Sequence, residues 1–494
     1  MLVIISDLHL TDGTCSEDLS SGALRIFAGR LCDLAHRASW RTDGRYEPID
    51  RIDLVLLGDV IDLVRSTRWL EGGVRPWHDT SSPQVVDTVG RIVDGILRNN
   101  GESLSVLRSL ASDGAVAIPP AASTGQAAYE SPPQPVAVRT HYMVGNHDWL
   151  LHLPGANYDL VRQKVAHHAG LANPHRAPFP HDPLESEELL EALRRHRVLA
   201  RHGDIFDPLN FTEDRDTSSL GDCIVIELVG RFQIEVQQQL GDELPEAVAA
   251  ALKEIDHIRP LLLIPMWLDG VLERACPLPA VRKKVKAIWD RLVDELLALE
   301  AVRDHDTWSP VQLVDGLERA LKFSKRLSIG WAAKVASWLY QLRGAEGESY
   351  YQHALAEQDF RNRRARHIVY GHTHQPESLA LDASYADGYV LNQMYFNTGT
   401  WRRVYHPTRL AVGGHEFIPT DAMTYLAFFQ ADERGGRPFE SWTGTLGAAP
   451  AELAEAQQQV AAAASSTRHR AFDAPHFAVP NRQNAGRATA PVRR

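Results

Sequence analysis

The stretch Leu2-Val3-Ile4-Ile5-Ser6-Asp7-Leu8-His9 begins with a short apolar run and ends with an acidic residue and a histidine. The run is brief and rich in Val, Ile and Leu, which is typical of a strand buried on both faces. The same order, an apolar run followed at once by polar residues, returns at four further places: Asp53–Leu57 before Gly58-Asp59, His141–Val144 before Gly145-Asn146-His147-Asp148, Arg197–Arg201 before His202-Gly203-Asp204, and His367–Tyr370 before Gly371-His372-Thr373-His374. The sequence therefore predicts buried strands that each deliver polar side chains at their carboxyl ends.

Helical patterns separate these predicted strands. Apolar residues recur at helical spacing between Leu24 and Leu34 and again between Val85 and Leu97. Strands that alternate with helices predict a layered α/β (α+β) fold. Because open sheets of this kind hold their sites beyond the carboxyl ends of the strands, we expect the polar residues to form one shared site.

The composition restricts the class of protein. The chain has 494 residues, of which 44% are hydrophobic and 23% charged, and these values exclude a disordered or fibrous chain. Its net charge of −11 argues against nucleic acid as a partner. The four cysteines form no C-x-x-C pair, so we expect small buried side chains in a reducing compartment. No basic signal segment follows Met1 and no apolar run is long enough to span a bilayer, which predicts a soluble cytoplasmic protein.

The pattern also divides the chain. Residues 1–219 and 345–447 carry the strand motifs and are predicted to form the core. Residues 220–344 are predicted to be a helical insertion, because apolar residues recur at helical spacing from Val281 to Leu299. Residues 448–494 contain few apolar side chains after an Ala/Gln run, which predicts a disordered tail.

The insertion leaves the core after His202 and returns before His372, so it is a candidate cap over the site. Its stretch from Leu261 to Leu268 is more apolar than one amphipathic stripe requires. Two interpretations stay open: a hydrophobic groove for a lipid-like or aromatic substrate, or the insertion's own core or an oligomer contact. The sequence does not decide the oligomeric state.

The polar residues at the strand ends make a set of metal donors. The set contains two carboxylates, one amide and four imidazoles: Asp7, His9, Asp59, Asn146, His202, His372 and His374. Mixed nitrogen and oxygen donors without thiolate suit Mn, Fe, Zn, Co or Ni. Seven donors exceed the need of one tetrahedral ion and fit two ions that share a carboxylate. A pair of close metal ions is a clamp for in-line phosphoryl displacement.

In this order, the motifs D-x-H, G-D-x-x-D, G-N-H-D, H-G-D and G-H-T-H resemble those of the calcineurin-like metallophosphoesterases. The resemblance covers about residues 1–62, 138–215 and 350–430 and leaves out the insertion and the tail. It implies a β-sandwich flanked by helices. It also implies a hydrolase of phosphoester bonds that uses two divalent ions, with manganese favoured, and a metal-bridging hydroxide as nucleophile.

The resemblance further implies a role for each donor: the first metal would be bound by Asp7, His9 and His374, the second by Asn146, His202 and His372, and both by the bridging carboxylate of Asp59. His147 would contact the phosphate and protonate the leaving oxygen, since an imidazole exchanges protons near neutral pH. Asp62, Asp148 and Asp204 would orient the ligand imidazoles from behind.

The substrate class stays open, because a fold does not fix a substrate. Monoesters, diesters and pyrophosphates are all candidates, and we expect a phosphorylated small-molecule or lipid-nucleotide substrate. Leu63 stands after Asp62 where the family's phosphoprotein phosphatases have Arg, and Asp148 stands where they have Glu. The nearest resemblance is to bacterial UDP-2,3-diacylglucosamine diphosphatases, which carry Arg in place of His147 and are much shorter. A phosphoprotein phosphatase or nuclease of the superfamily, and a non-catalytic binding scaffold, are the alternatives.

Three arginines follow the donor motifs: Arg65, Arg68 and Arg215. Each is a candidate to hold a second phosphate or carboxylate of the substrate through a bidentate contact. The alternative for each is a solvated loop charge.

Overall fold

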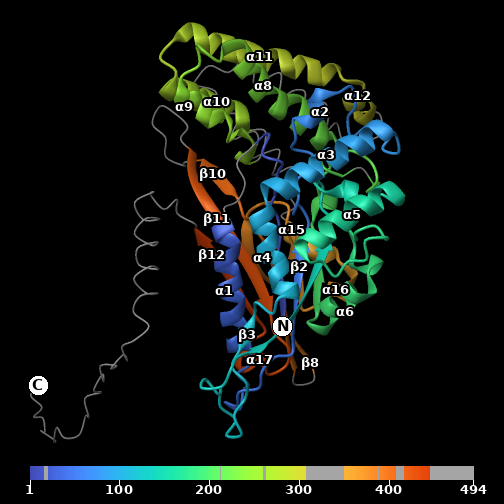
Figure 1. Ribbon diagram of the computed structural model, residues 1–494, viewed down its shortest axis with the longest axis vertical. Coiled ribbons are helices and arrows are strands. Elements are labelled where there is room, and N and C mark those ends of the chain that lie inside the picture. Colours follow the sequence, from blue (N-terminus) through green and yellow to red (C-terminus); the bar gives the residue numbers. More distant parts are fainter. Residues whose placement is uncertain are drawn as a thin grey trace, which may run out of the picture. The chain divides into compact units, whose positions relative to one another are not determined.

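The computed structural model describes residues 1–15, 21–211, 213–259, 263–306, 350–386, 389–407 and 417–445, which belong to one compact unit (Figure 1). Helices and strands alternate in the order that the sequence predicts, so the α/β class is confirmed. Residues 307–344 of the insertion and the tail 448–494 lie outside the described residues. Among the described helices, none has an apolar stretch long enough to cross a lipid bilayer.

The strands form two main sheets. They are β1 (Leu2–Ile5), β2 (Arg51–Leu57), β3 (Ala117–Ile118), β4 (Gln134–Pro135), β5 (Ala137–Met143), β6 (Val198–Ala200), β7 (His367–Tyr370), β8 (Pro376–Ala386), β9 (Tyr389–Thr398), β10 (Arg403–Pro407), β11 (Phe417–Phe428) and β12 (Phe439–Thr445). The first sheet has the order β10-β11-β1-β2-β5, with β12 on β11, and the second has the order β6-β7-β9-β8. Strands β1, β2 and β5 are parallel, as are β6, β7 and β9. All five strands predicted from the repeated pattern are present.

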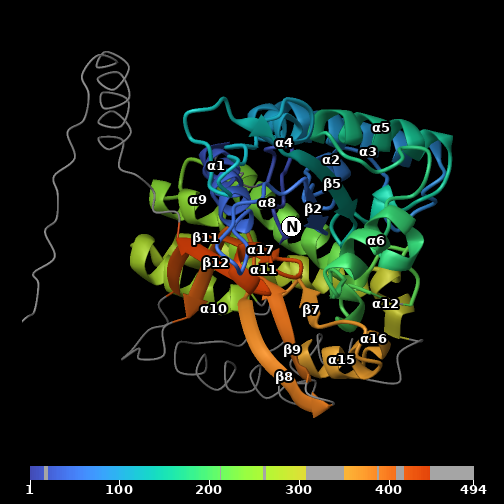
Figure 2. The same ribbon diagram turned by 90° about the horizontal axis from the view of Figure 1, so that it is seen from below.

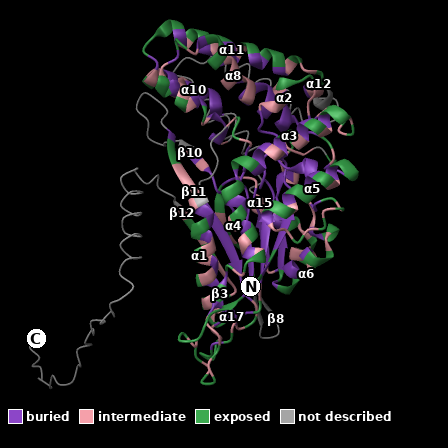
Figure 3. Cartoon of the chain, viewed as in Figure 1, coloured by how far each residue is buried: buried purple, intermediate pink, exposed green. Residues whose placement is uncertain are grey.

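The two sheets pack face to face. On β1, Leu2 and Ile4 share a buried cluster with Val369 and Phe396 of the second sheet, while Val3 and Ile5 belong to the cluster on the opposite face. Successive side chains of a strand point to opposite faces, so both faces of β1 are covered. This explains why its apolar run is continuous. Figure 2 shows α1, α4 and α5 on one side of the first sheet and β7–β9 on the other. Figure 3 shows that the central strands are buried.

The helices cover the sheets and build the insertion. In the core they are α1 (Ser21–Ala38), α2 (Arg68–Glu71), α3 (Pro83–Asn99), α4 (Gly101–Ser112), α5 (Ala156–Ala169), α6 (Glu187–Arg195), α15 (Tyr350–Ala356), α16 (Gln358–Arg361) and α17 (Glu433–Gly436). In the insertion they are α7 (Leu220–Cys223), a π-helix (Ile224–Gly230), α8 (Arg231–Leu240), α9 (Glu246–Leu252), α10 (Ile264–Ala275), α11 (Pro279–Ala298) and α12 (Glu300–Asp306). Helix α3 contains the predicted stretch from Val85 to Leu97. It begins at Pro83 because Ser82 caps it by accepting from the Val85 N–H, with Pro83 in its first turn.

The described part of the insertion has its own hydrophobic core. The apolar residues from Leu263 to Leu268 are buried in this core with the predicted stripe of α11. The expectation of an open hydrophobic groove along this stretch is therefore wrong for the described residues. Helix α10 packs against α9 within this core, and on β10 the Tyr405 ring lies 6.1 Å from that of Trp267.

A contact joins the insertion to the first sheet. Ile258 forms a parallel bridge with Tyr405 of β10, and Arg403 pairs with Glu254 at 2.8 Å. Between these anchors lies the short 3-10 helix Ile255–His257. The segment from Glu254 to Arg259 is thus held at the edge of the sheet that carries β1.

His367 supplies a test of the packing between the sheets. Its imidazole is buried among Phe396, Phe428 and Phe439, with ring centres 4.9–5.9 Å apart. Burial, reinforced by Arg366, lowers the pKa of His367 to about 3. Between about pH 6.5 and 3 the imidazole is therefore protonated in the unfolded chain but neutral in the folded one. The free energy of unfolding falls as the pH falls through this range.

His367→Leu should accordingly reduce the acid sensitivity of the fold. Between pH 6 and 4 we expect the variant to lose about 1.4 kcal/mol less unfolding free energy per pH unit than the wild type. Urea denaturation at both pH values measures this, with the exposed His167→Leu as control. The same pH slope in His367→Leu and the wild type would contradict the assignment.

Candidate metal centre

The seven predicted donors come together at the carboxyl ends of parallel strands from both sheets. Loops after β1, β2, β5, β6 and β7 supply them, and most of their side chains are buried. Five donors have left-handed backbones: Asp7, His9, Asp59, His372 and His374 have φ between 47° and 67°. Each non-glycine residue in this region costs about 1–3 kcal/mol, and such residues gather at functional sites. The backbone conformation of these loops is therefore typical of a functional site.

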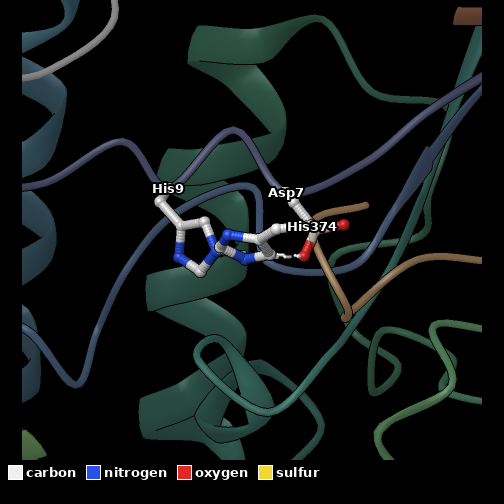
Figure 4. A group of neighbouring side chains, drawn as sticks. All are labelled: Asp7, His9 and His374. Atoms are coloured by element: carbon white, nitrogen blue, oxygen red, sulfur yellow. Dashed lines mark hydrogen bonds and ion pairs between the residues drawn. The ribbon is translucent and has the colours of Figure 1, made fainter. Parts of the chain in front are cut away.

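The first donor set consists of Asp7, His9 and His374, whose side chains point toward one another (Figure 4). The Nε2 atoms of His9 and His374 are 3.0 Å apart, and Asp7 Oδ1 lies 3.3 Å from His374 Nε2 and 3.9 Å from His9 Nε2. Three donor atoms of this kind, facing one another in a buried place, suit one cation.

Neighbouring groups fix which atoms of this set are available. His9 Nδ1 lies 2.8 Å from Asp62 Oδ2, which leaves Nε2 as the donor atom. Asp7 Oδ2 accepts hydrogen bonds from the Ser6 hydroxyl and the His372 backbone N–H, whereas Asp7 Oδ1 makes no hydrogen bond within the described part of the chain. Burial lowers the pKa of His9 and of His374 well below the usual range. Both imidazoles are thus neutral, as a metal ligand must be.

The second donor set consists of Asp59, Asn146, His202 and His372. Asp59 Oδ2 lies 3.3 Å from His202 Nε2, and Asn146 Oδ1 lies 3.0 Å from His372 Nδ1. His202 Nδ1 donates to the Leu57 carbonyl at 2.9 Å, so Nε2 is the atom that faces Asp59, and it makes no hydrogen bond within the described residues. Burial acts to lower the pKa of His202, but Asp59 outweighs it and raises the pKa well above its usual range. A cation bound here would therefore displace the Nε2 proton.

Asp59 lies between the two sets. Its Oδ2 atom is also 3.6 Å from His9 Nε2 of the first set, and its Oδ1 accepts the His147 backbone N–H at 2.8 Å. Burial acts to raise the pKa of Asp59, but the nearby His202 and His147 outweigh it and hold the pKa well below its usual range. A permanently ionised carboxylate between two donor sets is suited to bridge two cations.

Glycine at position 145 is required by this close approach. A Cβ atom added to Gly145 would lie 2.6 Å from His202 Cδ2 and 2.7 Å from its Nε2. The imidazole of His202 would have to leave its place. Gly145 is therefore needed to leave room for the His202 imidazole, and not only to form the turn before Asn146.

His147 and Asp62 form a pair beside the first set. His147 Nδ1 lies 2.9 Å from Asp62 Oδ1, and its ring centre is 4.7 Å from that of His9. One carboxylate, Asp62, thus orients a predicted ligand and the predicted general acid together. This agrees with the orienting part expected of Asp62.

Asp148 and Asp204 differ from the expectation, because neither hydrogen-bonds to a ligand imidazole. Asp148 accepts from the Tyr142 hydroxyl at 2.7 Å and from the backbone N–H groups of Val60 and Gly145. It ties the loops after β2 and β5 together. Asp204 pairs with Arg215 at 2.6 Å. Both carboxylates hold backbone or loop positions instead.

Two functional neighbours escaped the sequence analysis. Asp207 Oδ2 lies 3.0 Å from His372 Nε2 and accepts from Asn210 Nδ2 at 2.8 Å, while Asn210 Oδ1 accepts from Asn146 Nδ2 at 3.2 Å. Asp207 thus orients His372 as Asp62 orients His9. The available signal was a second carboxylate three residues after Asp204.

Asp207→Asn should weaken binding at the second donor set. Second-sphere carboxylates typically contribute about 10- to 100-fold to metal affinity, and we expect a loss of this size for one ion only. Calorimetric titration of Mn²⁺ into chelator-treated protein measures it, with the exposed Asp214→Asn as control. Unchanged affinity for both ions would contradict the role of Asp207.

Only one of the three candidate substrate arginines reaches the donors. Arg65 Nη1 lies 3.4 Å from His9 Nδ1 and 3.1 Å from Asp62 Oδ2. Arg68 pairs with Asp12 at 3.1 Å, and Arg215 is engaged by Asp204 and by the Gly145 carbonyl. The contacts of Arg215 favour a positioning role over a substrate contact.

The residues present fit a pair of divalent cations. Asp7 Oδ1 and His202 Nε2 are buried polar atoms without a hydrogen-bond partner in the described chain, and each faces the other donors. The donors are oxygens and imidazole nitrogens without thiolate, which suits Mn, Fe, Zn, Co or Ni.

No protein-family model matches the chain, and no curated protein matches it in sequence.

Proposed function

We propose that the chain is a phosphoester hydrolase of the calcineurin-like metallophosphoesterase type, with two divalent cations as cofactors. One observation carries the proposal: two complete donor sets meet at Asp59, whose Oδ2 lies 3.3 Å from His202 Nε2 and 3.6 Å from His9 Nε2. When bound, two such ions supply an activated water and neutralise the charge of the phosphate oxygens. Asp7, His9 and His374 would hold one ion, and Asn146, His202 and His372 the other.

His147 is the proton donor of this proposal. Its Nδ1–H is held by Asp62 at 2.9 Å, so Nε2 is the atom that would hand a proton to the leaving oxygen. Transfer of this proton would leave a neutral ring whose Nδ1–H still donates to Asp62. Asp62 thereby keeps His147 in one orientation throughout the reaction.

The completeness of the donor sets favours an enzyme over a non-catalytic scaffold. None of the seven donors has been replaced by an inert residue, and His147 stands beside them. The proposal leaves three substrate classes open: phosphodiesters, pyrophosphates and phosphomonoesters. A phosphorylated small molecule or a lipid-nucleotide is the proposed kind of partner.

The proposal is tested with one substrate of each class. These are bis(p-nitrophenyl) phosphate as a diester, p-nitrophenyl phosphate as a monoester and inorganic pyrophosphate as an anhydride. We expect turnover of at least one class by Mn²⁺-loaded protein and its loss in chelator. The exposed Arg98→Gln variant on α3, purified in the same way, serves as a control and should hydrolyse these substrates at the wild-type rate. Absence of turnover for all classes with Mn²⁺, Fe²⁺, Zn²⁺, Co²⁺ and Ni²⁺ would overturn the proposal.

A further inference from the structure

A second cluster of charges lies directly beside the candidate metal centre. Three arginines from distant parts of the chain gather around Asp256: Arg65 from the loop after β2, Arg259 from the insertion, and Arg402 from the loop after β9. The side chains of Arg65, Arg402 and Asp256 are buried, with 3%, 5% and 2% of their surface exposed. Buried arginines are rare unless carboxylates or ligands neutralise them.

One carboxylate oxygen serves two of these arginines. Asp256 Oδ2 lies 3.4 Å from Arg402 Nη2 and 3.5 Å from Arg65 Nε. Arg65 Nη2 makes no hydrogen bond within the described residues, although it is buried. Arg259 Nη1 donates to the backbone carbonyls of Asp256 and Ile258 rather than to a carboxylate. The Arg65 guanidinium therefore retains a buried donor that no group of the described chain takes up.

Among the described residues that form this cluster, positive charges outnumber negative ones. Arg65, Arg259 and Arg402 bring three positive charges, whereas Asp256 and Asp62 bring two negative ones. Burial, then Arg402, lowers the pKa of His257 to about 3, so this neighbour is neutral. Burial, together with Arg65 and Arg402, lowers the pKa of Arg259 to about 9. An additional anion would relieve this repulsion.

The cluster adjoins the first donor set. Arg65 Nη1 is 3.4 Å from His9 Nδ1, and the backbone N–H of Trp401, next to Arg402, donates to the Asp7 carbonyl at 3.2 Å. The insertion brings Asp256 and Arg259 here through the bridge between Ile258 and Tyr405. The insertion therefore contributes charged side chains at the border of the site.

We infer that Arg65, Arg259 and Arg402 form an oxyanion subsite that binds a second anionic group of the substrate, next to the phosphate that is hydrolysed. The group is a phosphate or a carboxylate, since guanidinium donors match the planar or tetrahedral oxygens of both. Its placement beside a reacting phosphate rests on the proposed function. The binding of an oxyanion by the three arginines does not.

Metal-free protein gives the first test. Inorganic phosphate is titrated calorimetrically into chelator-treated full-length protein, and we expect one phosphate to bind per chain. Arg259→Gln and Arg402→Gln should each weaken this binding by about tenfold or more, because each removes a charged donor. Arg195→Gln is the matched control, since Arg195 on α6 is paired with Glu191 at 2.6 Å and is not part of the cluster.

Asp256→Asn separates a binding role from a structural one. It removes the competing carboxylate, so phosphate should bind severalfold more tightly, although the fold is less stable. If the arginines only build the fold, Asp256→Asn should impair binding as the arginine variants do. Weaker binding by a folded Asp256→Asn variant, or no phosphate binding by the wild type, overturns the subsite.

Inhibition of the metal-loaded enzyme identifies the second group. With free Mn²⁺ held constant, the non-hydrolysable methylenediphosphonate should inhibit more tightly than phosphonoacetate if the group is a phosphate, and less tightly if it is a carboxylate. Equal inhibition by these two and by phosphate would overturn the placement of the subsite. A protein that binds phosphate at the arginines yet hydrolyses no ester would overturn the proposed function and leave the subsite standing.

Discussion

Asp59→Asn should abolish hydrolysis and release both ions. The substitution removes the one charge that lies 3.3 Å from His202 Nε2 and 3.6 Å from His9 Nε2. Two-metal sites supply several kcal/mol of transition-state charge stabilisation, so we expect kcat/KM to fall by about a thousandfold or more. Metal analysis of the purified variant, together with the rate on an aryl phosphate, measures both effects.

His374→Ala is the comparison for Asp59→Asn. His374 belongs to the first donor set alone, so this variant should retain about one ion per chain by the same analysis. If Asp59→Asn binds both ions with wild-type affinity, Asp59 does not bridge them, whatever the rate of hydrolysis of the variant.

His147→Ala should slow the hydrolysis of alkyl phosphoesters far more than that of nitrophenyl esters. A general acid matters most where the departing oxygen is basic, and it typically contributes about 100- to 10,000-fold. We expect a loss of this size for a methyl or nucleoside ester and a loss below about tenfold for the nitrophenyl ester. The kcat/KM values for the two leaving groups measure the difference.

Metal content is the control for His147→Ala, because His147 is expected to hold no ion. Equal losses on both substrates would make His147 a phosphate contact, and loss of an ion would make it a ligand. The exposed His167→Ala should leave both rates and the metal content unchanged.

The strands and the order of the candidate ligands could be predicted from the sequence. A strand buried on both faces must be apolar throughout, as Leu2–Ile5 is, and a polar residue directly after it must lie at the sheet's edge. These are local rules, so β1, β2, β5, β6 and β7 appear where predicted. The structure brings the seven donors together, and their role as ligands stays a prediction.

The surroundings of the donors depend on contacts between distant segments. Asp62 and Asp204 stand in similar motif positions, yet Asp62 reaches two imidazoles and Asp204 reaches Arg215. Nothing in the spacing tells these partners apart. Asp256 and Arg402 lie 146 residues apart and meet only because the insertion docks on β10.

For the apolar stretch of α10 the sequence left two interpretations open, and the structure supports the insertion's own core rather than an open groove. Composition does not say whether a surplus of apolar side chains is exposed or lies between two packed elements. Trp267 is 2% exposed, because it lies in the insertion's core and its ring also contacts Tyr405 of β10. The charged segment next to α10, rather than its apolar face, borders the candidate site.

A titration of Mn²⁺ into chelator-treated wild-type protein tests the central claim most directly, with metal binding and phosphoester hydrolysis followed in the same samples. The two donor sets predict that two ions bind per chain and that the rate reaches its maximum only when both are bound. Full hydrolytic activity in excess chelator, or a maximal rate with one ion per chain, would contradict the claim.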